Sequence, residues 1–363
     1  MTLSAQFDQL PARPAQAARV ARAGLPASFF HTDRLSPVDR FGAWRRSISV
    51  FIDVAPAGDD GGEPFTASVE SYLVDGIMLA RCAAGQQKFT RSTAKFAHDA
   101  IDHYMIQLFI KGGFDMRRGR QHIHGTAGHV VAFDCADVLD SANSDFDLLA
   151  IFIPRRRLAS LLHRPDSLHG VCPDPESGAG RMLTGYCLDL YMNAPWLDGR
   201  DARVMADMLV MLVAQAMNNT APRDLTQDDA AYVSLLRART HIRQNLADPG
   251  LDEAGVAAAA GLGVEELRRL FDPLGGLAAF LTEKRLRQAA CRLMQGEGRS
   301  WQQLAAEAGF AEPTRFARAF RKRFGCTPED VWQGTCSIRR MNREDLSPLC
   351  GDRTYEDWIV SLG

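Results

Sequence analysis

The last third of the chain contains an internal repeat, and this repeat constrains the fold more than any other feature. "VAAAAGLGVEELRRLF" at 256–271 matches "LAAEAGFAEPTRFARAF" at 304–320, and the central glycines Gly261 and Gly309 lie 48 positions apart. Each copy has the pattern of a helix, a glycine-containing turn and a second helix, which is typical of a helix-turn-helix unit. The repeat therefore predicts two such units and an all-α fold for this part of the chain.

The second copy carries local signals for both of its helices. Ser300 and Gln303 have the spacing of a capping box at the start of the first helix. Gly309 allows a left-handed turn, and Phe310 is placed to fill the angle between the helices. Pro313 suits the first turn of the next helix, where its missing N–H is not needed. These signals predict where each helix begins.

The second helix of this copy has one apolar face and one basic face. At about 100° per residue, Phe316 and Phe320 share the apolar face. The opposite face carries Arg315, Arg318 and Lys322, with Thr314 beside them. No acidic residue occurs between Glu312 and Glu329. A face that serves solubility alone normally mixes both signs of charge, so we interpret this one as a nucleic-acid contact, with a plain solvated face as the alternative.

The distribution of charge along the chain supports this interpretation. The whole chain has a formal net charge of −2, which gives no indication of nucleic-acid binding. Residues 232–334, however, hold 15 Lys plus Arg against 12 Asp plus Glu, and residues 285–323 hold nine against three. The basic charge is therefore concentrated around the second copy, where a contact with DNA would need it.

The first copy is the weaker candidate. Asp252 can cap its first helix. Its second helix offers Arg268 and Arg269 as candidate contacts, but Glu265 and Glu266 precede them and would repel phosphates.

The N-terminal half has a different pattern. Between about residues 65 and 153, short apolar runs such as "YMIQLFIKG" and "LLAIFI" are separated by Gly, Asp and Asn. Such closely spaced runs favour an antiparallel sandwich or barrel over a parallel sheet, because no helix-length segment intervenes. Two helical segments follow, and the apolar stripe of "DARVMADMLVMLVAQAMNN" can pack on the barrel alone or also bind a helix of a second subunit.

The sequence favours a reduced intracellular environment. Its eight cysteines form no Cys-x-x-Cys pair, and we interpret them as structural thiols. The N-terminus lacks the apolar run of a signal peptide, and no apolar stretch approaches the roughly 18 residues of a membrane span. We therefore expect a cytoplasmic protein without a membrane segment.

Residues 241–332 resemble the DNA-binding module of the AraC/XylS family. "GFAEPTRFARAFRKRFGCTPEDVW" is similar to the signature of the family's second unit, and "KRLRQAACRLM" is similar to its linker helix. The sequence departs from the family at Ala311, Thr314 and Arg315, where Ser, Ser and His are usual, and at Gly263, where Ser is the usual cap. The resemblance implies two helix-turn-helix units that bind successive major grooves of double-stranded DNA.

The resemblance also implies roles for the basic side chains. Arginine on guanine is the commonest specific contact, so base edges are the expected targets on the reading helices. The candidates for base edges are Thr314, Arg315 and Arg318, with Arg268 and Arg269 in the first unit. The candidates for phosphates are Arg321, Lys322 and Arg323, together with the start of the helix near 327–328.

The N-terminal half resembles the cupin-like sensor domain that often precedes this module. Trp44 and Arg45 in an early helix, "DHYMIQLFIKGG" and "GHVVAFD" carry the resemblance. It implies a small-molecule effector inside a barrel and dimerisation through the helices that follow. The candidate effector contacts are Tyr104, Gln107 and Phe109, which we expect on one face of "YMIQLFIK", with core packing as the alternative.

Together these features predict an α+β chain, with an N-terminal antiparallel β-barrel (cupin-like) and dimerisation helices, followed by an all-α double helix-turn-helix domain. The expected segments are a flexible arm at 1–27, a cupin-like sensor and dimerisation domain at 28–218, a linker at 219–231, the DNA-binding domain at 232–334 and an extension at 335–363. In the extension, Tyr355, Trp358, Ile359 and Leu362 have the spacing of a short packed helix.

The expected function is that of an effector-responsive, homodimeric transcription activator that binds DNA and RNA polymerase and needs no cofactor. The alternative is a metal-dependent enzyme of the cupin type with an appended helical domain. Its support is "HIHGTAGH", in which His122, His124 and His129 could supply three nitrogen ligands. Metal cupins usually add a Glu a few residues after His-x-His, and none is present at 125–128.

Overall fold

The computed structural model describes residues 24–57, 64–92, 95, 101–118, 121–220, 230–272, 275–294, 300–335 and 350–362. The chain forms two compact units. The first unit contains residues up to 92, 101–223 and 346–362, and the second unit is formed mainly by 224–345. Most of the predicted flexible arm, and most of the predicted linker, lie outside the described residues.

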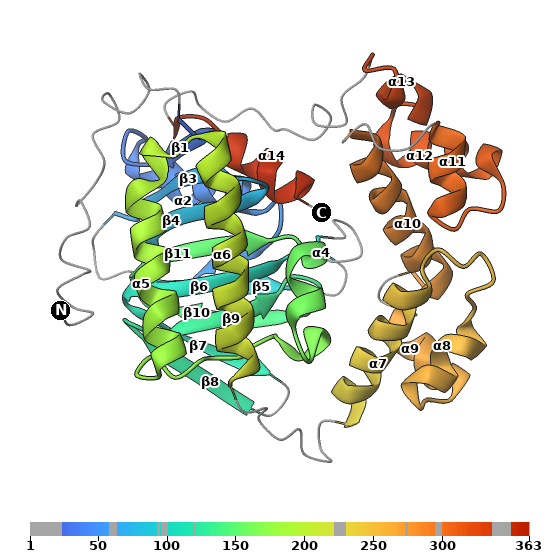
Figure 1. Ribbon diagram of the computed structural model, residues 1–363, viewed down its shortest axis with the longest axis horizontal. Helices are drawn as coiled ribbons and strands as arrows, with labels where there is room; N and C mark the ends of the chain where they lie inside the picture. The colour runs from blue at the N-terminus through green and yellow to red at the C-terminus, as the bar shows by residue number, and fades with distance from the viewer. Residues whose placement is uncertain are drawn as a thin grey trace. The chain divides into compact units, whose positions relative to one another are not determined.

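The first unit is built on two antiparallel sheets (Figure 1). The six-stranded sheet has the order β1 (Ala27–His31), β3 (Ala67–Val74), β4 (Ile77–Ala84), β11 (Phe146–Ile153), β6 (Tyr104–Lys111), β9 (Val130–Asp134). The five-stranded sheet has the order β2 (Asp53–Pro56), β5 (Gln87–Arg91), β10 (Leu139–Asn143), β7 (Gly113–Arg118), β8 (Gln121–Thr126). The expected α+β class is confirmed.

The sheets do not close into the predicted barrel. Both edges of the six-stranded sheet are occupied by short segments instead of by strands of the other sheet. Phe30 of β1 forms an antiparallel bridge with Gly351, and Ala132 of β9 forms one with Val171. Because these segments take the edge hydrogen bonds, the two sheets pack face to face as a sandwich.

Alternation along the strands gives the six-stranded sheet two buried faces. One face packs on the five-stranded sheet, with residues such as Met105 and Phe109 between the sheets. The other face is covered by helices, and Ile106 and Leu108 lie in that second core. Figure 1 shows α5 (Gly178–Asn193) and α6 (Gly199–Asn218) crossing this face.

The remaining helices of the first unit are short. They are α2 (Pro37–Ile48), α4 (Arg155–Leu158), α14 (Thr354–Ser361) and the 3-10 turns Ala159–Leu161, Pro165–Ser167 and Ala194–Trp196. The helix predicted near the C-terminus is α14, and Tyr355, Trp358, Ile359 and Leu362 are all buried in the core between the sheets. Among the described residues, no helix is long and apolar enough to cross a bilayer.

The second unit is all-α, as predicted. Its helices are α7 (Ala230–Asn245), α8 (Glu253–Ala260), α9 (Val264–Phe271), α10 (Leu277–Met294), α11 (Trp301–Glu307), α12 (Pro313–Phe324) and α13 (Pro328–Trp332). The pairs α8–α9 and α11–α12 are the two predicted helix-turn-helix units, and α10 connects them (Figure 1).

The local signals explain where these helices start and end. Asp252 accepts a hydrogen bond from the Gly255 N–H, and Ser300 accepts one from the Gln303 N–H. The Gln303 side chain does not complete the capping box, because it donates to Glu307 at 2.8 Å. Gly309 has φ +86°, in the left-handed region that glycine favours.

Candidate nucleic-acid interface and ligand pocket

The orientation of α12 is fixed by aromatic packing on one side. Phe316 and Phe320 are fully buried, and their rings are 5.3 Å apart. Phe310, in the turn before α12, packs edge-on against Phe316 at 5.1 Å. The other side of α12 is exposed, and it presents Thr314, Arg315, Arg318, Arg321 and Lys322.

The exposed cations of α12 form no ion pairs among the residues that the structure describes. Arg315, Arg318, Arg321 and Lys322 form no side-chain hydrogen bond or ion pair with any residue that the structure describes. Hydrogen bonds from Thr327 lower the pKa of Asp330, and the charge of Arg321 lowers it further without an ion pair between the two. Four positive charges on one helix face, none of them in an ion pair among the described residues, give a surface suited to a polyanion.

Arg323 lies differently from its predicted place among the phosphate contacts. Its side chain is half-buried, and its Nε lies 2.8 and 3.1 Å from the two carboxylate oxygens of Glu283 in α10. Glu283 also binds Arg287 at 2.8 Å. We therefore correct this assignment, because Arg323 ties α12 to α10 and its charge is already paired.

The reading helix of the first copy, α9, presents a balanced set of charges. Arg268 binds Glu253 at 2.8 Å and Glu265 at 2.6 Å, and the hydrogen bond to Glu253 is the larger cause of its raised pKa. Arg269 is exposed, with its Nε 3.4 Å from the Glu265 carbonyl oxygen. The Glu266 carboxylate accepts a hydrogen bond from the Gly263 N–H at 3.0 Å, which is the half of a capping box that does not require a serine side chain. Arg268 is thus held within the chain, unlike the arginines of α12.

The two helix-turn-helix units are locked together through α10. Arg285 of α10 donates to the carbonyl oxygens of Leu246 at 2.8 Å and Asp248 at 2.6 Å, and burial lowers its pKa. The turn of the second copy packs on the same place. A Cβ atom on Gly309 would lie 2.7 Å from the Leu246 carbonyl oxygen and 2.8 Å from the Arg285 Nε. The segment between α7 and α8 therefore fixes the position of the α11–α12 turn.

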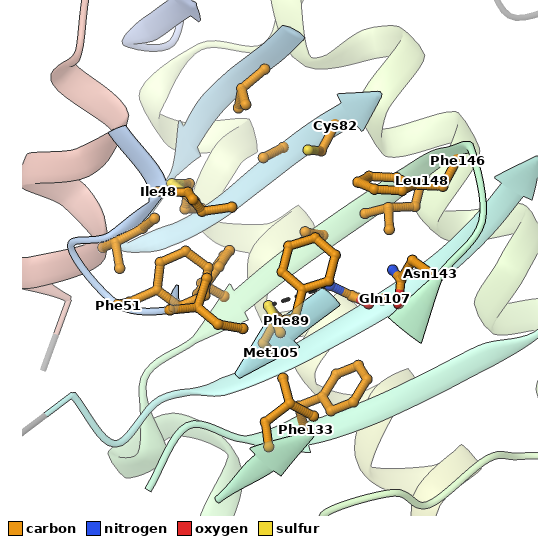
Figure 2. Close-up of a pocket in the computed structure, with 18 of the residues that line it drawn as sticks. Ile48, Phe51, Cys82, Phe89, Met105, Gln107, Phe133, Asn143, Phe146 and Leu148 are labelled. Carbon is orange, nitrogen blue, oxygen red and sulfur yellow. Dashed lines mark hydrogen bonds between the residues drawn. The ribbon is translucent and has the colours of Figure 1, made fainter. Parts of the chain in front are cut away.

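A cavity lies between the two sheets of the first unit (Figure 2). The cavity has a volume of about 60 Å³, roughly four times what one water needs. Most of its lining is apolar or aromatic, and Gln107, Ser141 and Asn143 are the polar members besides Tyr355 and Cys82. None of the described residues that line it is charged. Such a cavity suits an uncharged, mostly apolar molecule.

The polar groups of the cavity come from both sheets, with Gln107 in β6 of the six-stranded sheet and Ser141 and Asn143 in β10 of the five-stranded sheet. Figure 2 labels Gln107 and Asn143, and both side chains line the cavity. The Gln107 amide nitrogen donates only a weak bond to the Met105 sulfur at 3.6 Å, whereas Asn143 accepts from the Ser141 hydroxyl at 3.0 Å. The Gln107 amide therefore has capacity to bind a ligand.

The three predicted effector contacts do not share one face. Gln107 lines the cavity, and Phe109 lies in the same core, with its ring 5.1 Å from Phe114. Tyr104 faces the helix-covered side, where its hydroxyl donates to the Pro165 carbonyl oxygen at 2.9 Å and accepts from Arg155 at 2.7 Å. The prediction for Tyr104 was wrong because positions 104 and 107 differ by an odd number and so point to opposite faces of a strand.

The cavity also contains residues that the sequence did not indicate. Trp44 from α2 donates its indole N–H to Gln87 at 2.7 Å and lines one wall. Tyr355 and Ile359 line it from α14, far away in sequence. The spacing of apolar residues in α14 predicted a packed helix, but the sequence did not indicate that this helix packs against the cavity of the first unit.

The histidines of "HIHGTAGH" do not form a metal site. His122 and His124 are exposed, and His122 lies 3.7 Å from Asp115. His129 closes a turn, with its Nδ1 accepting from the Thr126 N–H at 3.2 Å. Among the described residues, no three His, Cys, Asp or Glu side chains are grouped so that they could hold a metal ion.

Comparisons with known proteins agree with this arrangement. Residues 256–333 match a family model described as a helix-turn-helix domain, and residues 43–218 match one described as an AraC-binding-like domain. The transcriptional activator NphR of Rhodococcus sp is 26% identical over 276 residues, covering 74% of this chain and 78% of NphR. RhrA, a transcriptional activator of Rhizobium meliloti, is 27% identical over 125 residues, covering 34% of this chain and 38% of RhrA.

A solved structure shares the fold. The crystal structure of the AraC-like transcriptional activator CuxR aligns with a TM-score of 0.53 at 19% identity, covering 73% of this chain and 96% of CuxR.

The HTH-type transcriptional regulator ExsA of Pseudomonas aeruginosa is 33% identical over 84 residues, covering 23% of this chain and 30% of ExsA. These relatives are regulators and not enzymes, so the metal-enzyme alternative has no support.

Proposed function

The chain belongs to the AraC family of DNA-binding transcription regulators, and from this premise we propose that it is an effector-responsive activator in which α12 makes the principal contact with DNA. The observation that carries this proposal is the exposed basic face of α12, whose cations form no ion pair among the described residues. A regulator with this role works in the cytoplasm, beside its DNA.

The proposed division of labour follows the position of each side chain along α12. Arg318 and Arg315, with Thr314, lie toward the N-terminal part of the helix and contact base edges in the major groove. Arg321 and Lys322, in the last turn, bind phosphates and set the register. In α9, Arg269 is the freer candidate, and Arg268 is available only when its two carboxylate partners release it.

The test is a binding-site selection with the full chain, followed by binding measurements with variants. Arg318→Ala is expected to weaken binding to the selected site by about 1–3 kcal/mol and binding to random DNA much less. Lys322→Ala is expected to weaken both equally and to reduce the salt slope by about one unit. Arg34→Ala, at an exposed arginine of the first unit outside the proposed dimer helices, is the control. Failure to enrich any site, or equal losses for Arg318→Ala on both DNAs, would contradict the proposal.

We also propose that α5 and α6 form the contact between two copies of the chain. The wide stripe of α6 splits in the structure. Leu209 and Val213 are buried against the sheet, whereas Val204, Met208 and Met211 are 44–65% exposed. Apolar side chains of this size gathered on one helix are typical of a protein contact. A dimer would bind two half-sites, and an activator bound there would contact RNA polymerase.

The effector site proposed here is the cavity between the sheets. Gln107 provides an amide with free hydrogen-bonding capacity, and the remaining lining is uncharged and mostly apolar. A carboxylate or ammonium effector would lose its water without gaining a charged partner, which is unfavourable. The expected effector is therefore a neutral molecule, ring-bearing or aliphatic, with one uncharged hydrogen-bonding group.

A further inference from the structure

Residues 350–362 follow the second unit in the sequence but pack in the first unit. Gly351 pairs with Phe30 at the edge of β1, and the Asp352 carboxylate accepts from the Ser28 hydroxyl at 2.5 Å and the Phe29 N–H at 3.0 Å. A Cβ atom on Gly351 would lie 2.1 Å from the Phe29 carbonyl oxygen, so the backbones are in close contact. The segment 350–352 is thus fastened to the edge of the six-stranded sheet.

The helix α14 that follows is fastened at both ends. Near its start, the Tyr355 hydroxyl lies 2.7 Å from the Ser47 hydroxyl of α2. Near its end, His103 Nε2 lies 2.7 Å from the carbonyl oxygen of Ile359. Between these points the apolar side of α14 is buried in the core of the first unit.

This helix forms part of the cavity wall. All other described lining residues lie between Trp44 and Phe152, in α2 and in strands held by sheet hydrogen bonds or in the segments next to them. Tyr355 and Ile359 come from α14. Cys82 of β4 lines the same cavity as Tyr355. A ligand in this cavity therefore meets one wall that belongs to a separate, C-terminal segment.

We propose that α14 is a ligand-binding element of the effector site: an uncharged, mostly apolar ligand contacts Tyr355 and Ile359 and stabilises the docked state of residues 350–362. This inference rests on the effector site proposed above. Because the ligand binds the docked state and loses two of its contacts when α14 leaves, binding shifts the equilibrium toward docking. The docked segment follows the second unit in the sequence but belongs to the first unit.

Specificity follows from the same geometry. Ile359 sets how much space the cavity offers on this side, and Tyr355 adds an aromatic face beside its Ser47-bound hydroxyl. Gln107 supplies a polar contact from β6. A change at Ile359 should therefore alter which neutral ligands bind, without touching the second unit.

The experiment uses Cys82 as a reporter in the full-length chain. Methyl methanethiosulfonate converts an accessible thiolate to a methyl disulfide and releases methanesulfinate, and peptide mass spectrometry assigns the site. Cys82 is partly buried and lines the cavity, and burial raises the pKa of its thiol, so the docked state should react slowly. Ile359→Ala is expected to increase the Cys82 rate by about tenfold or more, because it removes a buried anchor of α14. Val360→Ala, at the exposed neighbouring position, should leave the rate within about twofold.

Benzamide and phenol serve as uncharged probes, and benzoate as the charged counterpart. Hydrogen exchange is followed in peptides of β6, β10 and α14. Either uncharged probe is expected to slow exchange in all three and to slow Cys82 labelling, and Ile359→Ala should abolish the effect on α14 while Val360→Ala retains it. Protection of β6 and β10 with no change in α14 would overturn this inference and leave the effector site standing. No protection of any of the three by either probe would overturn both, whereas DNA binding by α12 would be unaffected.

Discussion

Replacing Gly309 by alanine tests how the two helix-turn-helix units are held together. The backbone at Gly309 has φ +86°, and for an L-residue the left-handed conformation costs about 1–2 kcal/mol. The new methyl group would also lie 2.7 Å from the Leu246 carbonyl oxygen and 2.8 Å from the Arg285 Nε, two atoms that are hydrogen-bonded to each other. Neither can move without disturbing that bond, so overpacking adds about 1–3 kcal/mol. We expect Gly309→Ala to cost about 2–5 kcal/mol in total.

The matched control is Gly261→Ala at the equivalent turn of the first copy. Gly261 has φ +70°, and the nearest atom to its added Cβ is Arg237 Nη1 at 3.7 Å, an ordinary contact. This variant therefore pays only the conformational cost of about 1–2 kcal/mol. The steric part is the difference between the two, about 1–3 kcal/mol, or roughly a 5- to 150-fold difference in local opening.

The assay is hydrogen–deuterium exchange of the full chain, read in peptides from α11 and α12 for Gly309→Ala and from α8 and α9 for Gly261→Ala. Local opening free energies come directly from the exchange rates. Gly309→Ala should also weaken binding to the selected DNA site, because the turn it displaces positions α12. For each variant, the loss of opening free energy is taken relative to the unsubstituted chain in the same peptides. Equal losses for the two variants would refute the reasoning, since they would show that the α7–α8 segment does not confine the α11–α12 turn.

Three further predictions concern other parts of the chain. Glu265→Gln removes one of the two carboxylates that hold Arg268, so DNA binding should tighten and the salt slope should steepen by up to about 0.9, with the selected site unchanged; a new preferred site would show that α9 reads bases through Glu265. Met211→Glu places a charge on the exposed stripe of α6 and should convert dimers to monomers in sedimentation, so a variant that stays dimeric would rule out this face. Burial lowers the pKa of His103, so the unfolded chain, with a histidine pKa of about 6.5, binds the proton more readily than the folded chain. The contribution of neutral His103 to the free energy of unfolding should therefore be fully present above about pH 6.5 and decrease below it. Thermal unfolding at about pH 7.5 and about pH 5.5 should show a smaller decrease in melting temperature for His103→Gln than for the unsubstituted chain. An equal decrease in both proteins would contradict this role.

The second unit was largely predictable because its signals are local. The caps at Asp252 and Ser300, the turn at Gly309 and the period of Phe316 and Phe320 each depend on residues within one turn or two. These signals also placed the exposed face of α12 correctly.

The pairing of individual arginines was not predictable in the same way. Arg323 meets Glu283, which is 40 residues away, and Arg268 meets Glu253, which is 15 away. Period and composition cannot reveal such partners, because the contact depends on how separate helices pack. In both cases the arginine forms an ion pair within the chain, whereas the sequence predicts a contact with DNA.

The first unit shows the same limit at larger scale. Alternating apolar runs predicted antiparallel sheets, but whether the sheets close depends on what binds their edges, and here Gly351 and Val171 do so. The error at Tyr104 was of another kind. The strand itself was predicted, and simple parity along it would have separated this residue from Gln107.

The late arrival of α14 has a consequence for synthesis on the ribosome. The Ser28–Asp352 bond joins residues 324 positions apart, so the core of the first unit cannot be completed until residues 352–362 are made. Between residue 220 and residue 362 the ribosome adds 142 residues, which takes about 7–30 s at about 5–20 residues per second. During that interval the apolar surface that α14 covers is open. A chain that terminates before α14 keeps that surface exposed, and exposed apolar surface is what chaperones and proteases recognise.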